Sequence, residues 1–142
     1  MSGVYDRWPQ IARENFSANF SKVDITNIDH VVFAGMGGSG TIGDLFASIL
    51  SKTDIHVSVI KGYLLPKTVD SNTLVVTTSI SGNTSETISI LKNVEKVDAK
   101  FVALSSGGIM EKFCMDKKIK YYKIKEEHSP RASFVGFLYS AL

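Results

Sequence analysis

Short apolar runs alternate along this chain with longer stretches in which apolar residues recur at helical spacing. This alternation is typical of βαβ units built around a parallel sheet. Three of the runs, residues 31–34, 74–76 and 101–104, are almost continuously apolar, as expected of strands that helices cover on both faces. The predicted strands are residues 30–34, 55–60, 73–78, 100–104 and 119–124.

Helices are expected between these strands and at both ends of the chain. The predicted helices are residues 5–20, 40–51, 84–94, 109–115 and a closing helix from Arg131 onward. If the strand order is the flavodoxin-like 2-1-3-4-5, the first and third strands are neighbours. The sequence thus predicts an α/β fold, a three-layer α/β/α sandwich with a five-stranded parallel sheet. No internal repeat or flexible linker interrupts it, so residues 1–142 are predicted to form a single domain.

Composition narrows the class of protein. Hydrophobic residues make up 44% of the 142 residues, charged residues 21%, and the net charge is +2, which describes a globular protein without a preference for nucleic acid. No apolar run approaches the ~20 residues that cross a bilayer, and no secretory leader is evident. Cys114 is the only cysteine and the histidines do not cluster, so neither an internal disulfide nor a metal site is expected. A cytoplasmic location without membrane association fits best.

Two polar turns each follow a predicted strand and precede a predicted helix. The first is Gly-Met-Gly-Gly-Ser-Gly at residues 35–40, and the second is Ser-Ile-Ser-Gly-Asn-Thr-Ser-Glu-Thr at residues 79–87. Open α/β sheets bind ligands at the carboxyl ends of their strands, and adjacent first and third strands would bring both turns to one pocket. The glycines let backbone amides approach an anion, while Ser39 adds a hydroxyl beside a helix start.

The hydroxyl residues of the second turn form an uncharged, donor-rich surface that suits the phosphate of a sugar phosphate. Gly82 and Asn83 tolerate positive φ, and Asn83 with Glu86 resembles a helix-capping arrangement. Ser79, Ser81 and Thr84 are then left as ligand donors, and they are predicted to contact phosphate.

Each of the two turns also has an interpretation that does not involve a phosphosugar. Either turn alone is accounted for more simply by tight turn geometry and helix capping. Gly35, Gly37 and Gly40 also match the dinucleotide fingerprint, but the second strand runs into Lys61 and Gly62 without the acidic residue that binds ribose. NAD is therefore a poor second choice. No Gly-Lys-Ser/Thr follows the first strand, so a P-loop is absent from the sequence.

Residues 35–40, residues 79–87 and the tetrapeptide Ser-Pro-Arg-Ala at residues 129–132 together resemble the sugar isomerase (SIS) domain. More narrowly, they resemble the amino-terminal half of the archaeal-type bifunctional phosphoglucose/phosphomannose isomerases, and the resemblance covers essentially the whole chain. It implies a five-stranded parallel α/β/α sandwich that binds a hexose 6-phosphate without a cofactor. It also implies phosphate contacts from Ser39, Ser79, Ser81 and Thr84 and from the backbone of Gly37 and Gly38.

The resemblance further implies a reaction. In such isomerases an aldose phosphate opens and a proton moves between C1 and C2 through an enediolate, so that glucose 6-phosphate or mannose 6-phosphate interconverts with fructose 6-phosphate. Arg131 would lie near the reacting carbons as a catalytic residue, because its fixed charge can stabilise the enediolate oxygen. The simpler alternative is that Arg131 is a solvated residue at a helix entry.

The family's catalytic Glu and ring-opening His lie in a second SIS half, and those residues have no counterpart here. The chain is therefore expected to be the amino-terminal fragment of a two-SIS-domain protein, to lack the catalytic base alone, and to pair with a second SIS domain or a homodimer partner. Glu86 is a weaker candidate base, since capping is its preferred role, and His128 is more simply a solvated residue. A noncatalytic sugar-phosphate sensor and a single-SIS phosphosugar isomerase are the alternative functions.

Overall fold

A single parallel sheet organises the computed structural model, which describes residues 2–18 and 20–142. The strand order is β2-β1-β3-β4-β5, and every neighbouring pair is parallel, so the predicted order and fold class are confirmed. The strands are β1 (His30–Ala34), β2 (His56–Ile60), β3 (Thr73–Ser79), β4 (Lys100–Ser105) and β5 (Lys120–Lys123).

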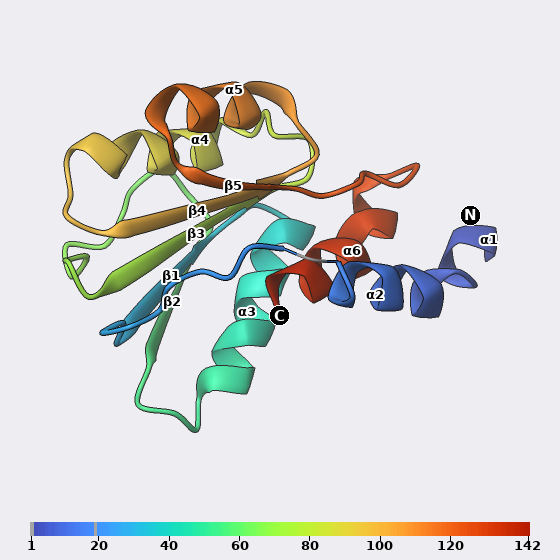
Figure 1. Cartoon of the computed structure of the whole chain (residues 1–142), viewed down its shortest axis with the longest axis horizontal. Coiled ribbons are helices and arrows are strands. Elements are labelled where there is room, and N and C mark those ends of the chain that lie inside the picture. The colour runs from blue at the N-terminus through green and yellow to red at the C-terminus, as the bar shows by residue number, and fades with distance from the viewer. Residues whose placement is uncertain (1, 19) are drawn as a thin grey trace.

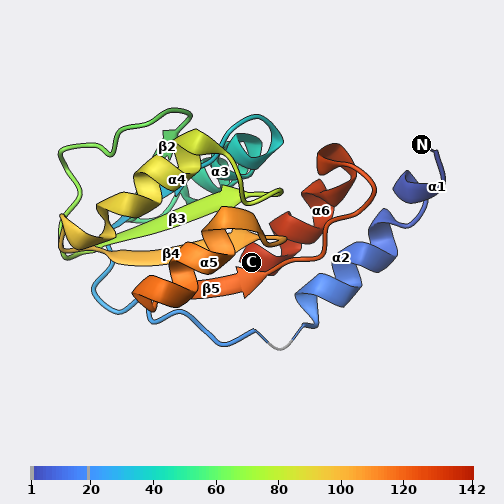
Figure 2. The same cartoon turned by 90° about the horizontal axis from the view of Figure 1, so that it is seen from above.

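Helices cover both faces of the sheet and give three layers (Figure 1). One face carries α4 (Ser85–Leu91), which runs on into the 3₁₀ turn Lys92–Glu95, and α5 (Gly108–Lys117). The opposite face carries α3 (Gly38–Leu50) and α6 (Pro130–Ala141). Figure 2 shows α2 (Trp8–Phe16) lying along α6, with α1 (Ser2–Tyr5) beyond it. No helix within the described residues is long and apolar enough to span a membrane.

The sheet separates two hydrophobic cores, because successive side chains of a strand point to opposite faces. In β1, Val31 belongs to the core that contains Ile42 of α3 and Phe137 of α6. Its neighbour Val32 belongs to the core that contains Met110 of α5. The central strands are therefore buried along their whole length, which is why they appear in the sequence as continuous apolar runs.

The amino-terminal segment differs from the single helix predicted over residues 5–20. It forms two helices, of which the second starts at Trp8 and ends at Phe16, and position 19 of the predicted range lies outside the described residues. Pro9 explains the break, because proline has no backbone N–H to donate to the preceding turn and fits best at a helix start. Most other predicted boundaries agree with the structure to within about two residues, as is usual for element ends.

Candidate functional site

Both polar turns leave the sheet at its carboxyl edge. Parallel pairing of β1 and β3 places Ala34 opposite Thr77, so the loop after β1 and the loop after β3 start side by side. A cavity of about 740 Å³ lies there. Its described lining comes from four separate parts of the chain: Trp8, Met36, Gly38, Ser39, Thr41, Ile80, Ser81, Thr84, Ser129, Pro130, Arg131 and Phe134.

The first loop presents backbone donors at the start of α3. Gly37 has φ of +55°, a conformation that glycine adopts without strain, and the chain turns there into the helix. The N–H groups of Gly37 and Gly38 donate to no other group among the described residues. Ser39 is only 8% exposed, and its hydroxyl also lacks a hydrogen-bond partner within the described chain. Gly38 and Ser39 line the cavity, whereas Gly37 shapes the turn behind them.

The second loop divides its hydroxyl groups between two tasks. Ser79 is 2% exposed; its Oγ accepts the N–H of Gly82 at 3.1 Å and is hydrogen-bonded to Oγ1 of Thr84 at 2.8 Å. Ser79 is not among the cavity-lining residues, so its hydroxyl holds the shape of the loop. Ser81 and Thr84 do line the cavity, and their backbone N–H groups have no partner in the described part of the chain. Four of the six predicted phosphate ligands, including Gly38 and Ser39, thus reach the cavity wall.

The capping role predicted for Asn83 is wrong, whereas Glu86 does lie in the first turn of α4, as predicted. Asn83 Oδ1 instead accepts the backbone N–H of Ile109, at 3.0 Å, in the first turn of α5. The residue that precedes α4 is Thr84, whose side chain makes no capping bond. The reason is the turn at Gly82, where φ of +70° directs Asn83 toward the unpaired amides at the start of α5. The second loop is therefore tied to α5 as well as to α4.

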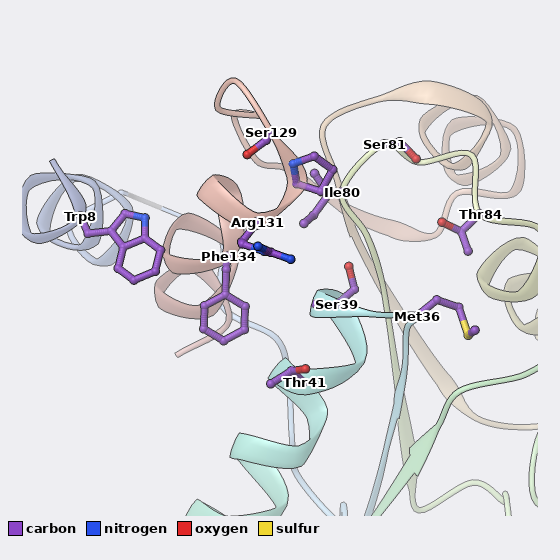
Figure 3. A pocket seen from close by; sticks show the side chains of 12 residues that line it. Trp8, Met36, Ser39, Thr41, Ile80, Ser81, Thr84, Ser129, Arg131 and Phe134 are labelled. Atoms are coloured by element: carbon purple, nitrogen blue, oxygen red, sulfur yellow. The ribbon is translucent and has the colours of Figure 1, made fainter. Parts of the chain in front are cut away.

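The third contribution comes from the start of α6. Ser129 caps this helix, with its Oγ accepting the N–H of Ala132 at 3.3 Å, and Pro130 occupies the first helical position. Arg131 follows on the cavity side. It forms no ion pair or side-chain hydrogen bond with any described residue, and Figure 3 shows its guanidinium group extending from α6 toward Ser39. Its charge is thus available to a ligand.

The amino-terminal ends of α3, α4 and α6 meet at the cavity, through Gly38, Thr84 and Pro130. Helix dipoles and unpaired N–H groups make such ends favourable for anions. Arg131 is the only charged residue within the described lining, and no carboxylate contributes to it. Hydroxyl, amide and guanidinium donors suit a phosphate group, whereas a hard metal ion would require carboxylate oxygens.

The apolar part of the cavity was not predicted from the sequence. Trp8 and Phe134 line it beside Arg131, and Met36 lines it beside Thr84 (Figure 3). Trp8 precedes the first strand and Phe134 follows the last one, so local patterns could show only that each belongs to an amphipathic helix. The two weaker candidates, Glu86 and His128, do not line the cavity.

Comparison with known proteins identifies the fold family. The model of the SIS domain family matches residues 24–141 of this chain. The chain belongs to the SIS domain family. Its five-stranded sheet and paired loops are therefore those of a SIS domain. The C-terminal domain of glucosamine-fructose-6-phosphate aminotransferase from Francisella tularensis shares this fold, with a TM-score of 0.74 at 16% identity over 96% of this chain and 44% of that one.

Two curated relatives indicate the kind of protein in which such a SIS domain occurs. A bifunctional phosphoglucose/phosphomannose isomerase of Caldicellulosiruptor bescii is 38% identical over 121 residues, which cover 84% of this chain and 35% of that protein. A D-glucosamine-6-phosphate 4-epimerase of Sulfolobus acidocaldarius is 27% identical over 135 residues, which cover 94% of this chain and 42% of that protein. The chain therefore spans less than half the length of these relatives.

Proposed function

We propose that this chain is the sugar-phosphate-binding SIS domain of an aldose-ketose isomerase that interconverts glucose 6-phosphate and mannose 6-phosphate with fructose 6-phosphate. One observation carries the proposal: Ser39 at the start of α3, Ser81 in the loop after β3 and Arg131 at the start of α6 line a single cavity. The name of the 38% identical relative, bifunctional phosphoglucose/phosphomannose isomerase, supports the same reaction.

In this proposal the phosphate group binds between the first two loops. The hydroxyl groups of Ser39, Ser81 and Thr84 and the free amide of Gly38 would donate to its oxygens. Ser79 would act indirectly, since its hydroxyl already bonds to Thr84 and to the backbone of Gly82. Gly37 would contribute through the turn that exposes its own amide and that of Gly38.

The reacting carbons would then lie toward α6. A general base removes the proton from C2 of the open aldose, the electron pair forms the enediolate, and a proton is delivered to C1 to give the ketose. Arg131 would stabilise the negative oxygen of the enediolate, because its guanidinium remains protonated and is not engaged by other described residues. We infer that the base comes from outside these 142 residues, since the described lining contains no carboxylate and no imidazole.

We further infer that the domain works with a second SIS domain, in the same chain or in a homodimer partner, because its isomerase relative is more than twice as long. A cytoplasmic location also belongs to this proposal, since Cys114 is a buried free thiol.

Calorimetric titration with fructose 6-phosphate tests the binding part of the proposal. Replacement of Ser81 or Thr84 by alanine should weaken binding at least about tenfold each, because one hydrogen bond to a charged phosphate group contributes about 1.5–3 kcal/mol. Ser71→Ala is the matched control, since Ser71 is exposed and lies before β3, at the opposite edge of the sheet. Native affinity in both cavity variants would contradict the proposal. The chain alone should show no isomerase turnover, and measurable turnover would show that the base lies within it.

A further inference from the structure

Trp8 lines the cavity but belongs to none of the three motifs that resemble the SIS domain. It begins α2, and its indole lines the cavity together with Phe134 and Pro130 of α6. Figure 3 shows these aromatic rings on the Arg131 side, away from Ser81 and Thr84. The cavity thus has a polar end suited to phosphate and an aromatic end beside the guanidinium group.

The indole ring is held in a defined orientation. Its Nε1–H donates to the backbone carbonyl of Ala132 at 3.3 Å, one residue beyond Arg131. Tyr5 packs edge-on against it, with ring centroids 4.8 Å apart and an interplanar angle of 84°. A hydrogen bond at one edge and an aromatic contact restrict the rotamers of the side chain, so little conformational entropy remains to be lost when a ligand binds.

A sugar phosphate has one part that these aromatic rings can recognise. Its phosphate and hydroxyl groups require donors and acceptors, but its C–H groups form apolar surfaces with a slight positive charge. The face of an indole ring carries the negative part of the aromatic quadrupole and attracts such groups. A ligand whose phosphate lies at Ser81 and Thr84 would extend its carbon chain toward Arg131, where the indole is the largest apolar side chain of the wall.

We propose that Trp8 contacts the carbon chain of the bound sugar and thereby sets the affinity for a phosphosugar over free phosphate. This inference rests on the function proposed above and adds to it a residue that determines specificity. It also gives the amino-terminal helices a role in the site, since α2 carries Trp8 and packs along α6.

Two ligands distinguish the role of Trp8 from that of the phosphate loops. Fructose 6-phosphate and inorganic phosphate are titrated into the whole 142-residue chain and its variants. Trp8→Ala should weaken fructose 6-phosphate binding about tenfold, which is about the upper limit for the loss of one aromatic contact. The affinity for inorganic phosphate should stay unchanged, because phosphate has no carbon chain to contact the indole. Trp8→Phe keeps a ring and should stay within about threefold of the native affinity. Ser81→Ala should weaken both ligands.

Phe16→Ala is the matched control, because Phe16 lies on the same helix, is 66% exposed and does not line this cavity. The native protein supplies an independent measurement, since Trp8 is the only tryptophan of the chain. Its fluorescence should change as fructose 6-phosphate saturates the site, and phosphate should leave the emission wavelength unchanged. This measurement decides the question if Trp8→Ala does not fold.

Three results would overturn the inference. Equal weakening of both ligands in Trp8→Ala would mean that Trp8 acts on the site as a whole, and unchanged affinity for both would mean that it contacts neither. Saturation with fructose 6-phosphate without any change in Trp8 emission would also exclude the contact. If the native chain bound neither ligand, the proposed function would fail as well. If the native chain bound both ligands and Trp8→Ala kept the native affinities, only the inference about Trp8 would be refuted.

Discussion

Ser79 Oγ lies 2.8 Å from Oγ1 of Thr84, and this hydrogen bond closes the loop between β3 and α4. Ser79 ends β3 opposite Ser105 of β4, inside the sheet, whereas Thr84 stands at the cavity wall. The buried Ser79 hydroxyl therefore fixes the direction of the half-buried Thr84 hydroxyl. A motif with two serines so close in sequence thus contains one buried structural serine and one exposed serine at the cavity, whose Oγ accepts the N–H of Asn83 at 3.2 Å and can still donate its proton to a ligand.

Ser79→Ala should consequently reduce stability, and Ser81→Ala should not. Loss of the Ser79 hydroxyl leaves the Thr84 hydroxyl without its partner and removes one of the two acceptors of the Gly82 N–H, which keeps the Ser79 carbonyl oxygen at 3.0 Å, and we expect a cost of about 1–3 kcal/mol of unfolding free energy. Ser81 is exposed, and water can replace its Oγ as the acceptor of the Asn83 N–H, so its replacement should change the unfolding free energy by only about 0.5 kcal/mol. Urea denaturation of the two variants measures both values. Equal stabilities would show that the Ser79 bonds do not support the loop.

Gly82 is expected to tolerate no side chain. Its φ is +70°, and a Cβ built there would lie 1.8 Å from the carbonyl oxygen of Gly107. The left-handed conformation alone costs an alanine about 1–2 kcal/mol, and the collision adds to this because both groups belong to backbone. Gly82→Ala should therefore lower the midpoint of thermal unfolding and separate the β3–α4 loop from the start of α5.

Gly62→Ala is the control for that substitution. Apart from its two chain neighbours, no residue places a heavy atom within 4 Å of the position where its Cβ would stand, so the effect of the substitution on stability should be close to zero. If Gly82→Ala unfolds at the same temperature as Gly62→Ala, the close packing of the two loops is not present in solution.

Stability should fall as the pH drops below about 6.5, and His30 is a main cause. Burial and the neighbouring His56 ring, 4.9 Å away between centroids, lower the pKa of His30 below its usual value. The unfolded chain then takes up a proton at a higher pH than the folded one does. The contribution of His30 is therefore complete above its unfolded pKa of about 6.5 and is lost as the pH falls toward the folded pKa.

His30→Gln should flatten the slope of unfolding free energy against pH between about pH 7 and pH 5, by at most about 1.4 kcal/mol per pH unit. His128→Gln is the control substitution, since His128 follows β5, at the edge of the sheet that is farthest from β2 and separated from β1 by two strands. Chemical denaturation at a series of pH values gives both slopes. Identical slopes in the native chain and in His30→Gln would contradict the assignment, whatever the absolute stability of the variant.

Much of the fold could be predicted because its signals are local. The runs that form β1, β3 and β4 are apolar since both faces of each strand are buried, and the glycine at position 37 marks a turn that requires positive φ. The βα pattern left the strand order as an assumption taken from flavodoxin-like folds, which the structure confirms, and the expectation of one cavity followed from the adjacency of β1 and β3.

The remaining features depend on contacts between distant segments. Asn83 has two helix starts within reach, and the sequence pattern favours α4, but the turn at Gly82 presents its side chain to Ile109, 26 positions away. The Trp8 indole bonds to the carbonyl of Ala132, 124 positions away. Ser79 and Ser81 are the same residue type two positions apart, and only the length of β3 decides which one is buried. No local pattern contains this information.

Nuclear magnetic resonance of the ¹⁵N-labelled chain titrated with fructose 6-phosphate tests most directly whether two loops form one site. We expect the amide signals of Gly38 and Ser39 and those of Ser81 and Thr84 to shift together along one binding curve, because both loops line the same cavity. Shifts in only one loop, shifts that follow two different dissociation constants, or no shift at all would contradict a shared phosphosugar site.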